Sequence, residues 1–228
     1  MVRLPRVEEA WMVSVRITGK TVLLALAAVV VLESSGALLL RALKTPPLPT
    51  VGIFRLLEAI AFLYLLRSQG GLAATVGISG QSLLRDAGRG LLWSAGFGLV
   101  VLAISSLVFL ARGRLVDLLP FAHPSPLSLL PVLLAVGAFI SPVAEELFFR
   151  GILFGYLRRW GFLPALVLST ALFAFIHPPG QGFPVTQVIG GVLFATAYEV
   201  EKSLVVPMVI HGLGNGAIFL LSYYPELF

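Results

Sequence analysis

Residues 142–154 read PVAEELFFRGILF and place Glu145, Glu146 and Arg150 in one of the most apolar stretches of the chain. An ionised side chain near the centre of a membrane helix costs about 2.5–3.5 kcal/mol on insertion scales. Such charges persist in membranes where they pair with one another, contact water or perform a function. The stretch therefore predicts a membrane helix that carries a functional site.

The composition extends the membrane interpretation to the whole chain. Hydrophobic residues make up 58% of the 228 residues and charged residues only 12%, whereas soluble domains carry about 25% charged residues. The absence of cysteine excludes disulfides, thiolate metal sites and a cysteine nucleophile. The net charge of +5 comes from basic residues scattered at segment ends, so we expect membrane lipids and no nucleic acid as partners.

Apolar segments long enough to span a bilayer divide the chain. We expect an all-α protein, a polytopic membrane helical bundle of about seven or eight transmembrane helices, in a prokaryotic cell membrane. Between the spans we expect a loop with a short helix at 68–89 and a proline-rich loop at 115–126. The expected spans are 21–43, 51–67, 90–111, 127–160, 162–177, 184–200 and 203–223.

Two of these spans contain features that need explanation. The segment 127–160 is longer than a bilayer is thick, and proline removes an internal hydrogen bond, so we expect a break or kink near Ser141 and Pro142. The second span carries Arg55 and Glu58, which are three positions apart and can pair on one helix face.

The first cluster of reactive side chains lies in the opening stretch. Glu146 precedes Arg150 by four residues, which is the favoured spacing for an ion pair on a helix. Glu145 points about 100° away from Glu146 around the helix axis, so it is left for another partner. The alternative is a buried charge network that only holds helices together.

Two further clusters also have helical spacing. Phe173 precedes His177 by four residues, and His211 precedes Asn215 by four, so each pair shares a helix face. The glycines that follow His211 allow another helix to approach closely. The alternatives are a histidine at the rim of the membrane for His177 and a hydrogen bond between helices for the second pair.

Together the clusters supply the groups needed for hydrolysis. A glutamate and a histidine can hold and deprotonate water, and a second histidine with an asparagine can donate hydrogen bonds to the oxyanion. Glu145, His177 and His211 could instead bind zinc, which often takes two histidines and a glutamate. The sequence contains neither a His-Glu-x-x-His helix nor a Gly-x-Ser-x-Gly motif, so the usual arguments for a zinc protease or a serine esterase do not apply.

The three clusters, in this order and inside apolar spans, resemble the motifs of the CPBP family, the CAAX protease and bacteriocin-processing group, also called Abi. The resemblance includes the CAAX prenyl protease 2 type and covers residues 127–223. Residues 1–126 supply N-terminal transmembrane helices and loops without a recognised motif. We treat both parts as one integrated membrane domain.

The resemblance implies an intramembrane endopeptidase with its site in a cavity open to water and lipid. It favours a glutamate mechanism that requires no cofactor, with zinc as the alternative. The implied roles are Glu145 as general base, His177 as its partner on the water, His211 and Asn215 as the oxyanion site, and Glu146, Arg150 and Phe173 as residues that order the site.

The resemblance also limits what the substrate can be. It implies a membrane-associated or lipidated peptide or protein, such as one with a prenylated C-terminal Cys-a-a-X tail. Two other functions stay open at this point. One is a non-catalytic membrane partner or bacteriocin-immunity factor, and the other is a proton-coupled transporter that uses the buried carboxylates and histidines.

Overall fold

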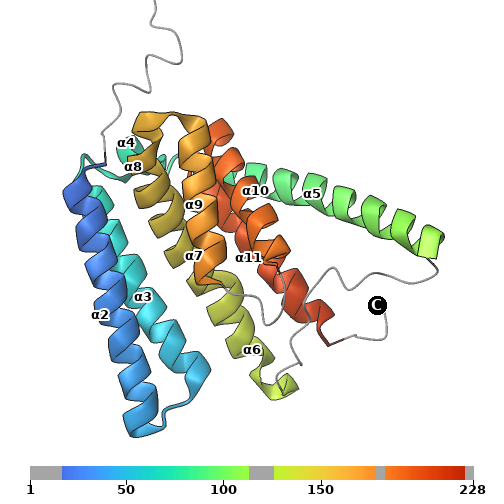
Figure 1. Ribbon diagram of the computed structural model, residues 1–228, viewed down its shortest axis with the longest axis horizontal. Helices are drawn as coiled ribbons and strands as arrows, with labels where there is room; N and C mark the ends of the chain where they lie inside the picture. Colours follow the sequence, from blue (N-terminus) through green and yellow to red (C-terminus); the bar gives the residue numbers. More distant parts are fainter. Residues whose placement is uncertain (1–16, 113–125, 178–182, 224–228) are drawn as a thin grey trace, which may run out of the picture.

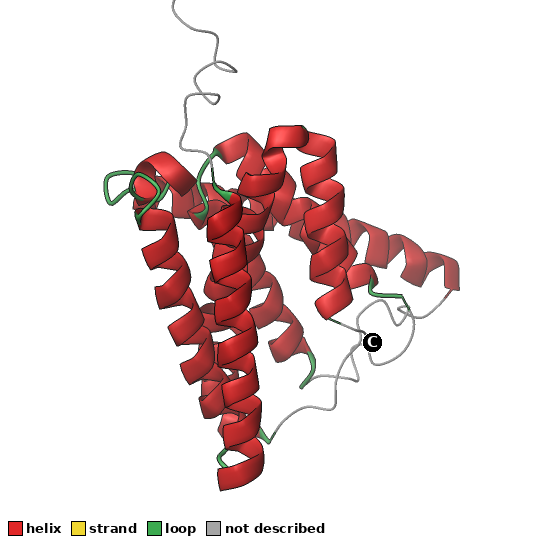
Figure 2. Ribbon diagram, turned by 60° about the vertical axis from the view of Figure 1, so that its left-hand side comes forward, coloured by secondary structure: helices red, strands yellow, loops and turns green. Residues whose placement is uncertain are grey.

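The computed structural model describes residues 17–112, 126–177 and 183–223. Within these ranges every regular element is a helix and none is a strand (Figure 2). Residues 127–160 form one uninterrupted helical stretch made of short segments, η1 to η4 with α6 to α8 between them. We call this stretch the central helix. The elements are α2 (Gly19–Leu43), α3 (Pro47–Arg67), α4 (Leu72–Val76), α5 (Leu83–Arg112), η1 (Leu127–Leu129), α6 (Leu130–Leu133), η2 (Leu134–Ile140), α7 (Ser141–Glu146), η3 (Leu147–Phe154), α8 (Gly155–Leu157), η4 (Arg158–Trp160), α9 (Phe162–Ile176), α10 (Val185–Glu201) and α11 (Val205–Leu221).

Among the described residues, four helices are long and apolar enough to cross a membrane, namely α2, α3, α5 and the central helix. The shorter helices α9 and α11 are also apolar. A helix satisfies its backbone hydrogen bonds internally, as a chain segment in lipid must. The prediction of an all-α membrane helical bundle is confirmed, and the described ranges contain eight helices when the central helix is counted once.

The start of the third span was predicted wrongly. α5 begins at Leu83 and not at residue 90, because the polar residues that suggested a loop form its first turns. Asp86 is buried there, and Arg89 donates a hydrogen bond to Glu201 of α10 at 2.9 Å. The short helix expected at 68–89 is α4, whereas the loop expected at 115–126 lies almost wholly outside the described residues.

A break or kink was expected near Ser141 and Pro142, and the central helix is not interrupted there. The backbone stays helical throughout, and its hydrogen-bond pattern changes instead. The π-helical segment η2 ends directly before Ser141, and the second π-helical segment, η3, begins directly after α7. Local π turns supply new partners for backbone groups freed by a proline, and they often mark functional sites. Both glutamates of the opening stretch lie in α7, between the two π segments.

Glycines mark the places where other helices approach the central helix most closely. A Cβ added to Gly52 of α3 would lie 2.7 Å from a methyl group of Val136. A Cβ added to Gly212 of α11 would lie 2.6 Å from the carbonyl oxygen of Ala138. The central helix is therefore packed between the α2–α3 hairpin on one side and α9, α10 and α11 on the other (Figure 1).

The remaining long helix, α5, packs mainly on α11 and then extends away from the bundle (Figure 1). Trp93 anchors its first half through a hydrogen bond from Nε1 to Glu201 at 3.0 Å. The deepest part of the molecule lies instead around η3, where Arg150 is the largest side chain that is almost fully buried. A buried guanidinium needs partners, and these partners define the candidate site.

Candidate active site

Arg150 of η3 pairs with Glu146 of α7 inside the bundle. The Nη1 atom of Arg150 lies 2.8 Å from Oε1 of Glu146, and the two side chains are 1% and 0% exposed. A second hydrogen bond, 3.3 Å long, runs from Nη2 to the carbonyl oxygen of Gly191 in α10. The ion pair predicted from the four-residue spacing is confirmed, and it also ties the central helix to α10.

Aromatic rings surround the Arg150 guanidinium. The rings of Phe149, Phe173 and Phe194 lie 5.7, 4.8 and 5.1 Å from its Cζ atom. Cation–π contacts of this kind gain strength where water is excluded. Phe173, which was expected to order the site, thus contacts the charged group of Arg150.

His211 of α11 connects the two glutamates. Its Nδ1 atom lies 2.8 Å from Oε1 of Glu146, and its Nε2 atom lies 3.6 Å from Oε2 of Glu145. Its ring stacks on Phe194 with centroids 4.6 Å apart and an interplanar angle of 18°. Because a carboxylate only accepts hydrogen bonds, Nδ1 carries the proton, and Nε2 faces Glu145.

His177 follows the last turn of α9 and lies on the other side of Glu145. Its Nδ1 atom donates to the carbonyl oxygen of Phe173 at 2.8 Å, and its Nε2 atom lies 3.6 Å from Oε1 of Glu145. Each oxygen of this carboxylate therefore faces the Nε2 atom of one histidine. The His177 side chain is 30% exposed and that of Glu145 is 10% exposed, so this edge of the cluster is open.

Asn215 lies one turn beyond His211 on α11. Its Nδ2 atom donates to the carbonyl oxygen of Gly137 in η2 at 2.9 Å. The structure thus brings Glu145, His177 and His211 together, and it places Asn215 beside them along α11 with its amide fixed to the central helix. A second N–H of the amide is left for another acceptor.

Two contributions from α10 were missed by the sequence analysis. Phe194 stacks on His211, and the Gly191 carbonyl accepts from Arg150. No signal in the sequence distinguishes this phenylalanine from other aromatic residues in apolar spans, and a backbone carbonyl has no sequence signature at all. Both contacts depend on how helices distant in the sequence pack.

The zinc alternative depends on how the donor side chains are arranged. Among the residues that the structure describes, no group of three histidine, cysteine, aspartate or glutamate side chains is arranged to hold a metal ion. Glu145, His177 and His211 are nevertheless the donors that would be used, since they face one another.

The close contact at Gly212 predicts an effect on activity. In Gly212→Ala the new Cβ would meet the Ala138 carbonyl and push α11 away from η2, moving His211 relative to Glu145. Misplacement of a reacting group by about 1 Å can cost on the order of 100-fold in rate. We expect a loss of at least about tenfold in any activity of the site. A Cβ on Gly214 has no neighbour within 4 Å, so Gly214→Ala is the matched control and should keep full activity.

Comparisons with known proteins identify relatives of the part of the chain that carries the site. Residues 127–217 match the family model described as type II CAAX prenyl endopeptidase Rce1-like. The membrane-embedded CAAX protease MroQ of Staphylococcus aureus (strain USA300) is 34% identical over 100 residues, which are 41% of this chain and 40% of that protein. The putative membrane peptidase YdiL of Bacillus subtilis (strain 168) is 27% identical over 96 residues, 42% of this chain and 39% of that protein. No solved structure matches.

The match contains all seven side chains expected at the site. Residues 127–217 are therefore similar to the Rce1-like family of type II CAAX prenyl endopeptidases. The chain spans about two fifths of the length of the curated relatives that it matches. With four helices of spanning length, the protein is a multi-pass membrane protein, as predicted.

Proposed function

We propose that the protein is an intramembrane endopeptidase that hydrolyses a peptide bond of a membrane-associated, lipidated protein or peptide. The observation that carries this proposal is the position of Glu145, whose two carboxylate oxygens each lie 3.6 Å from a histidine Nε2 atom. A carboxylate held between two imidazoles at an opening of a membrane bundle is suited to activate water. The family model that residues 127–217 match supports the same chemistry.

In the proposed reaction Glu145 and His177 hold the attacking water. Because Nδ1 of His177 donates to the Phe173 carbonyl, a neutral His177 has a free lone pair on Nε2 that can accept a hydrogen bond from water. The water oxygen attacks the carbonyl carbon, and one water proton passes to Glu145. Collapse of the tetrahedral intermediate breaks the C–N bond, and Glu145 returns the proton to the leaving amine.

His211 and Asn215 are proposed to stabilise the oxyanion. With its Nδ1 proton directed at Glu146, His211 can donate from Nε2 only as an imidazolium. Asn215 would add its second amide N–H, and such donors together can be worth about 100- to 1,000-fold in rate.

The test is cleavage of a fluorogenic, lipidated Cys-a-a-X peptide by the purified full-length protein in detergent. We expect cleavage by the wild type, loss of cleavage in His177→Ala, and unchanged cleavage in the presence of a chelator. Activity that is lost with the chelator and restored by zinc would assign the mechanism to a metal held by Glu145, His177 and His211. If the wild type cleaves neither this peptide nor a library of membrane-associated peptides, the non-catalytic alternative becomes the better explanation.

A further inference from the structure

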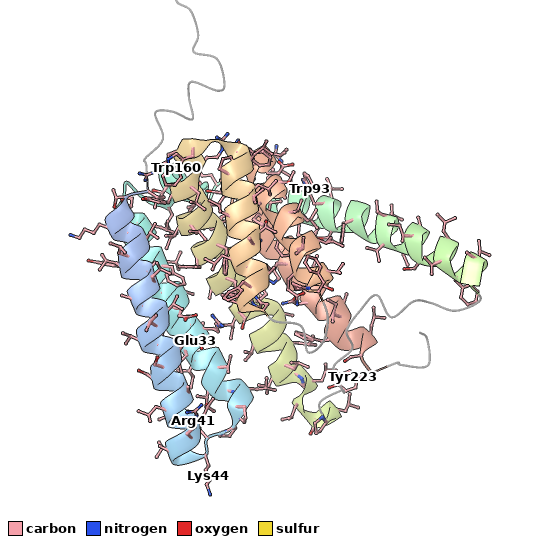
Figure 3. All side chains as sticks on the ribbon, viewed as in Figure 1. Glu33, Arg41, Lys44, Trp93, Trp160 and Tyr223 are labelled. Atoms are coloured by element: carbon pink, nitrogen blue, oxygen red, sulfur yellow. The ribbon has the colours of Figure 1, made fainter. Side chains whose placement is uncertain are left out.

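A second cluster of charged side chains lies in the membrane-spanning hairpin of α2 and α3. Nη1 of Arg55 donates to Oε2 of Glu58 at 2.8 Å, as the three-residue spacing predicted, and Nη2 lies 3.0 Å from Oε1 of Glu33 in α2. Glu33 lies near the middle of α2, far from Arg41 and Lys44 at its end (Figure 3). Three charges at this depth are costly, so they are candidates for a function. The cluster lies outside the residues that match the family.

Arg55 lies on the face of α3 that packs on the central helix. It follows Gly52 by three residues and precedes Phe62 by seven, which places all three on one helix face. Gly52 packs against Val136, and the ring of Phe62 lies 5.5 Å from the ring of Phe148. Arg55 is therefore level with the part of the central helix that lies between these two contacts.

That part of the central helix carries Glu145. The helix that carries Arg55 packs directly against α7, which carries Glu145. The two charged clusters, one in each half of the chain, thus face each other across the contact between α3 and α7. Arg55 supplies a positive charge beside the proposed site of hydrolysis.

The two carboxylates that bind Arg55 differ in exposure. Glu58 is 1% exposed and lies on the same helix, so it is a fixed partner that orients the guanidinium. Glu33 is 49% exposed, belongs to another helix and contacts a guanidinium that is itself 25% exposed. Glu33 is therefore the partner that another carboxylate can replace.

We propose that Arg55 binds a carboxylate of the substrate, which displaces Glu33 from the guanidinium. This inference rests on the proposed peptidase function and names a specificity residue for it. Arginine matches a carboxylate with paired N–H donors, and Glu33 occupies the position that the substrate group would take. One to three residues of extended chain span about 3.5–10 Å. Over such distances the charge of Arg55 can act on a substrate bound at the proposed site, because the surroundings have a low dielectric constant. The carboxylate therefore belongs to the C-terminus or to an acidic side chain within about three residues of the cleaved bond.

The experiment compares three versions of the same fluorogenic lipidated peptide, ending in a free acid, in an amide, or in an amide with an added aspartate. We expect the wild type to prefer the free acid over the amide by about 10- to 100-fold in kcat/KM, mainly through KM, as fits hydrogen bonds to charged groups. Arg55→Gln should abolish this preference while the amide is still cleaved. Glu33→Gln should lower KM for the acid, because it removes the competing carboxylate. The aspartate peptide distinguishes a terminal from a side-chain carboxylate.

Two controls separate recognition from folding. Arg55→Lys keeps the charge and should keep part of the preference, and Arg67→Gln, an exposed position on the same helix, should keep all of it. Equal cleavage of acid and amide by the wild type, or an equal loss on both peptides in Arg55→Gln, would overturn the inference. Direct binding of the peptides to the Glu145→Gln protein tests whether Arg55 recognises the carboxylate even if no cleavage occurs. A failure of the peptidase proposal can therefore be distinguished from a failure of this inference. Equal affinity for acid and amide in that assay would also overturn it.

Discussion

Replacing Glu145 with glutamine is expected to abolish peptide hydrolysis and leave the protein folded. The substitution keeps the size of the side chain and removes only the group that accepts the water proton. General base catalysis contributes about 100- to 10,000-fold, and activity should fall by at least this factor. Because His177 and His211 are also held by Phe173 and Glu146, respectively, both imidazoles should stay in place.

The measurement is kcat on the fluorogenic peptide, together with the unfolding temperature of both proteins in detergent. Glu199→Gln is the matched control, since Glu199 pairs with Arg158 and Lys202 at the end of α10 and has no role in the proposed site. It should keep its activity. A Glu145→Gln protein that retains more than about a tenth of wild-type kcat would show that another group activates the water.

The local part of the site could be predicted from the sequence because helical spacing determines it. Glu146 and Arg150 are four residues apart, as are Phe173 and His177, and each pair is in contact. The separation of the roles of Glu145 and Glu146 also follows from a turn of about 100° per residue. None of these inferences requires knowledge of how the helices pack.

The contacts between helices could not be predicted in the same way. That His177 and His211 both face Glu145 was implied by the family resemblance and not by any spacing, because 65 positions separate His211 from Glu146, its bonded partner. The π-helical segments on either side of α7 were missed, since the sequence shows only a proline in an apolar span. The Glu33–Arg55 pair was missed for a similar reason, because it joins two helices.

Breaking the buried Arg150–Glu146 pair should destabilise the protein strongly. Arg150→Met removes the positive charge at nearly constant volume and leaves Glu146 buried beside His211 alone. An uncompensated buried charge costs about 3–5 kcal/mol. We expect this loss in the free energy of unfolding, measured by denaturant titration in detergent. Arg67→Met, at an exposed position, should change it by no more than about 0.5 kcal/mol.

The double variant Arg150→Met with Glu146→Gln identifies the cause of that loss. If the unpaired charge is responsible, removing it should restore much of the stability, because buried ion pairs often contribute little net stability compared with neutral side chains. A double variant no more stable than Arg150→Met would contradict this and assign the loss to the aromatic rings around the guanidinium. Activity should not recover with stability, since a glutamine can no longer hold the Nδ1 proton of His211 with a full negative charge. Recovered folding without recovered catalysis would separate the two roles of Glu146, which holds the helices together and orients the His211 ring.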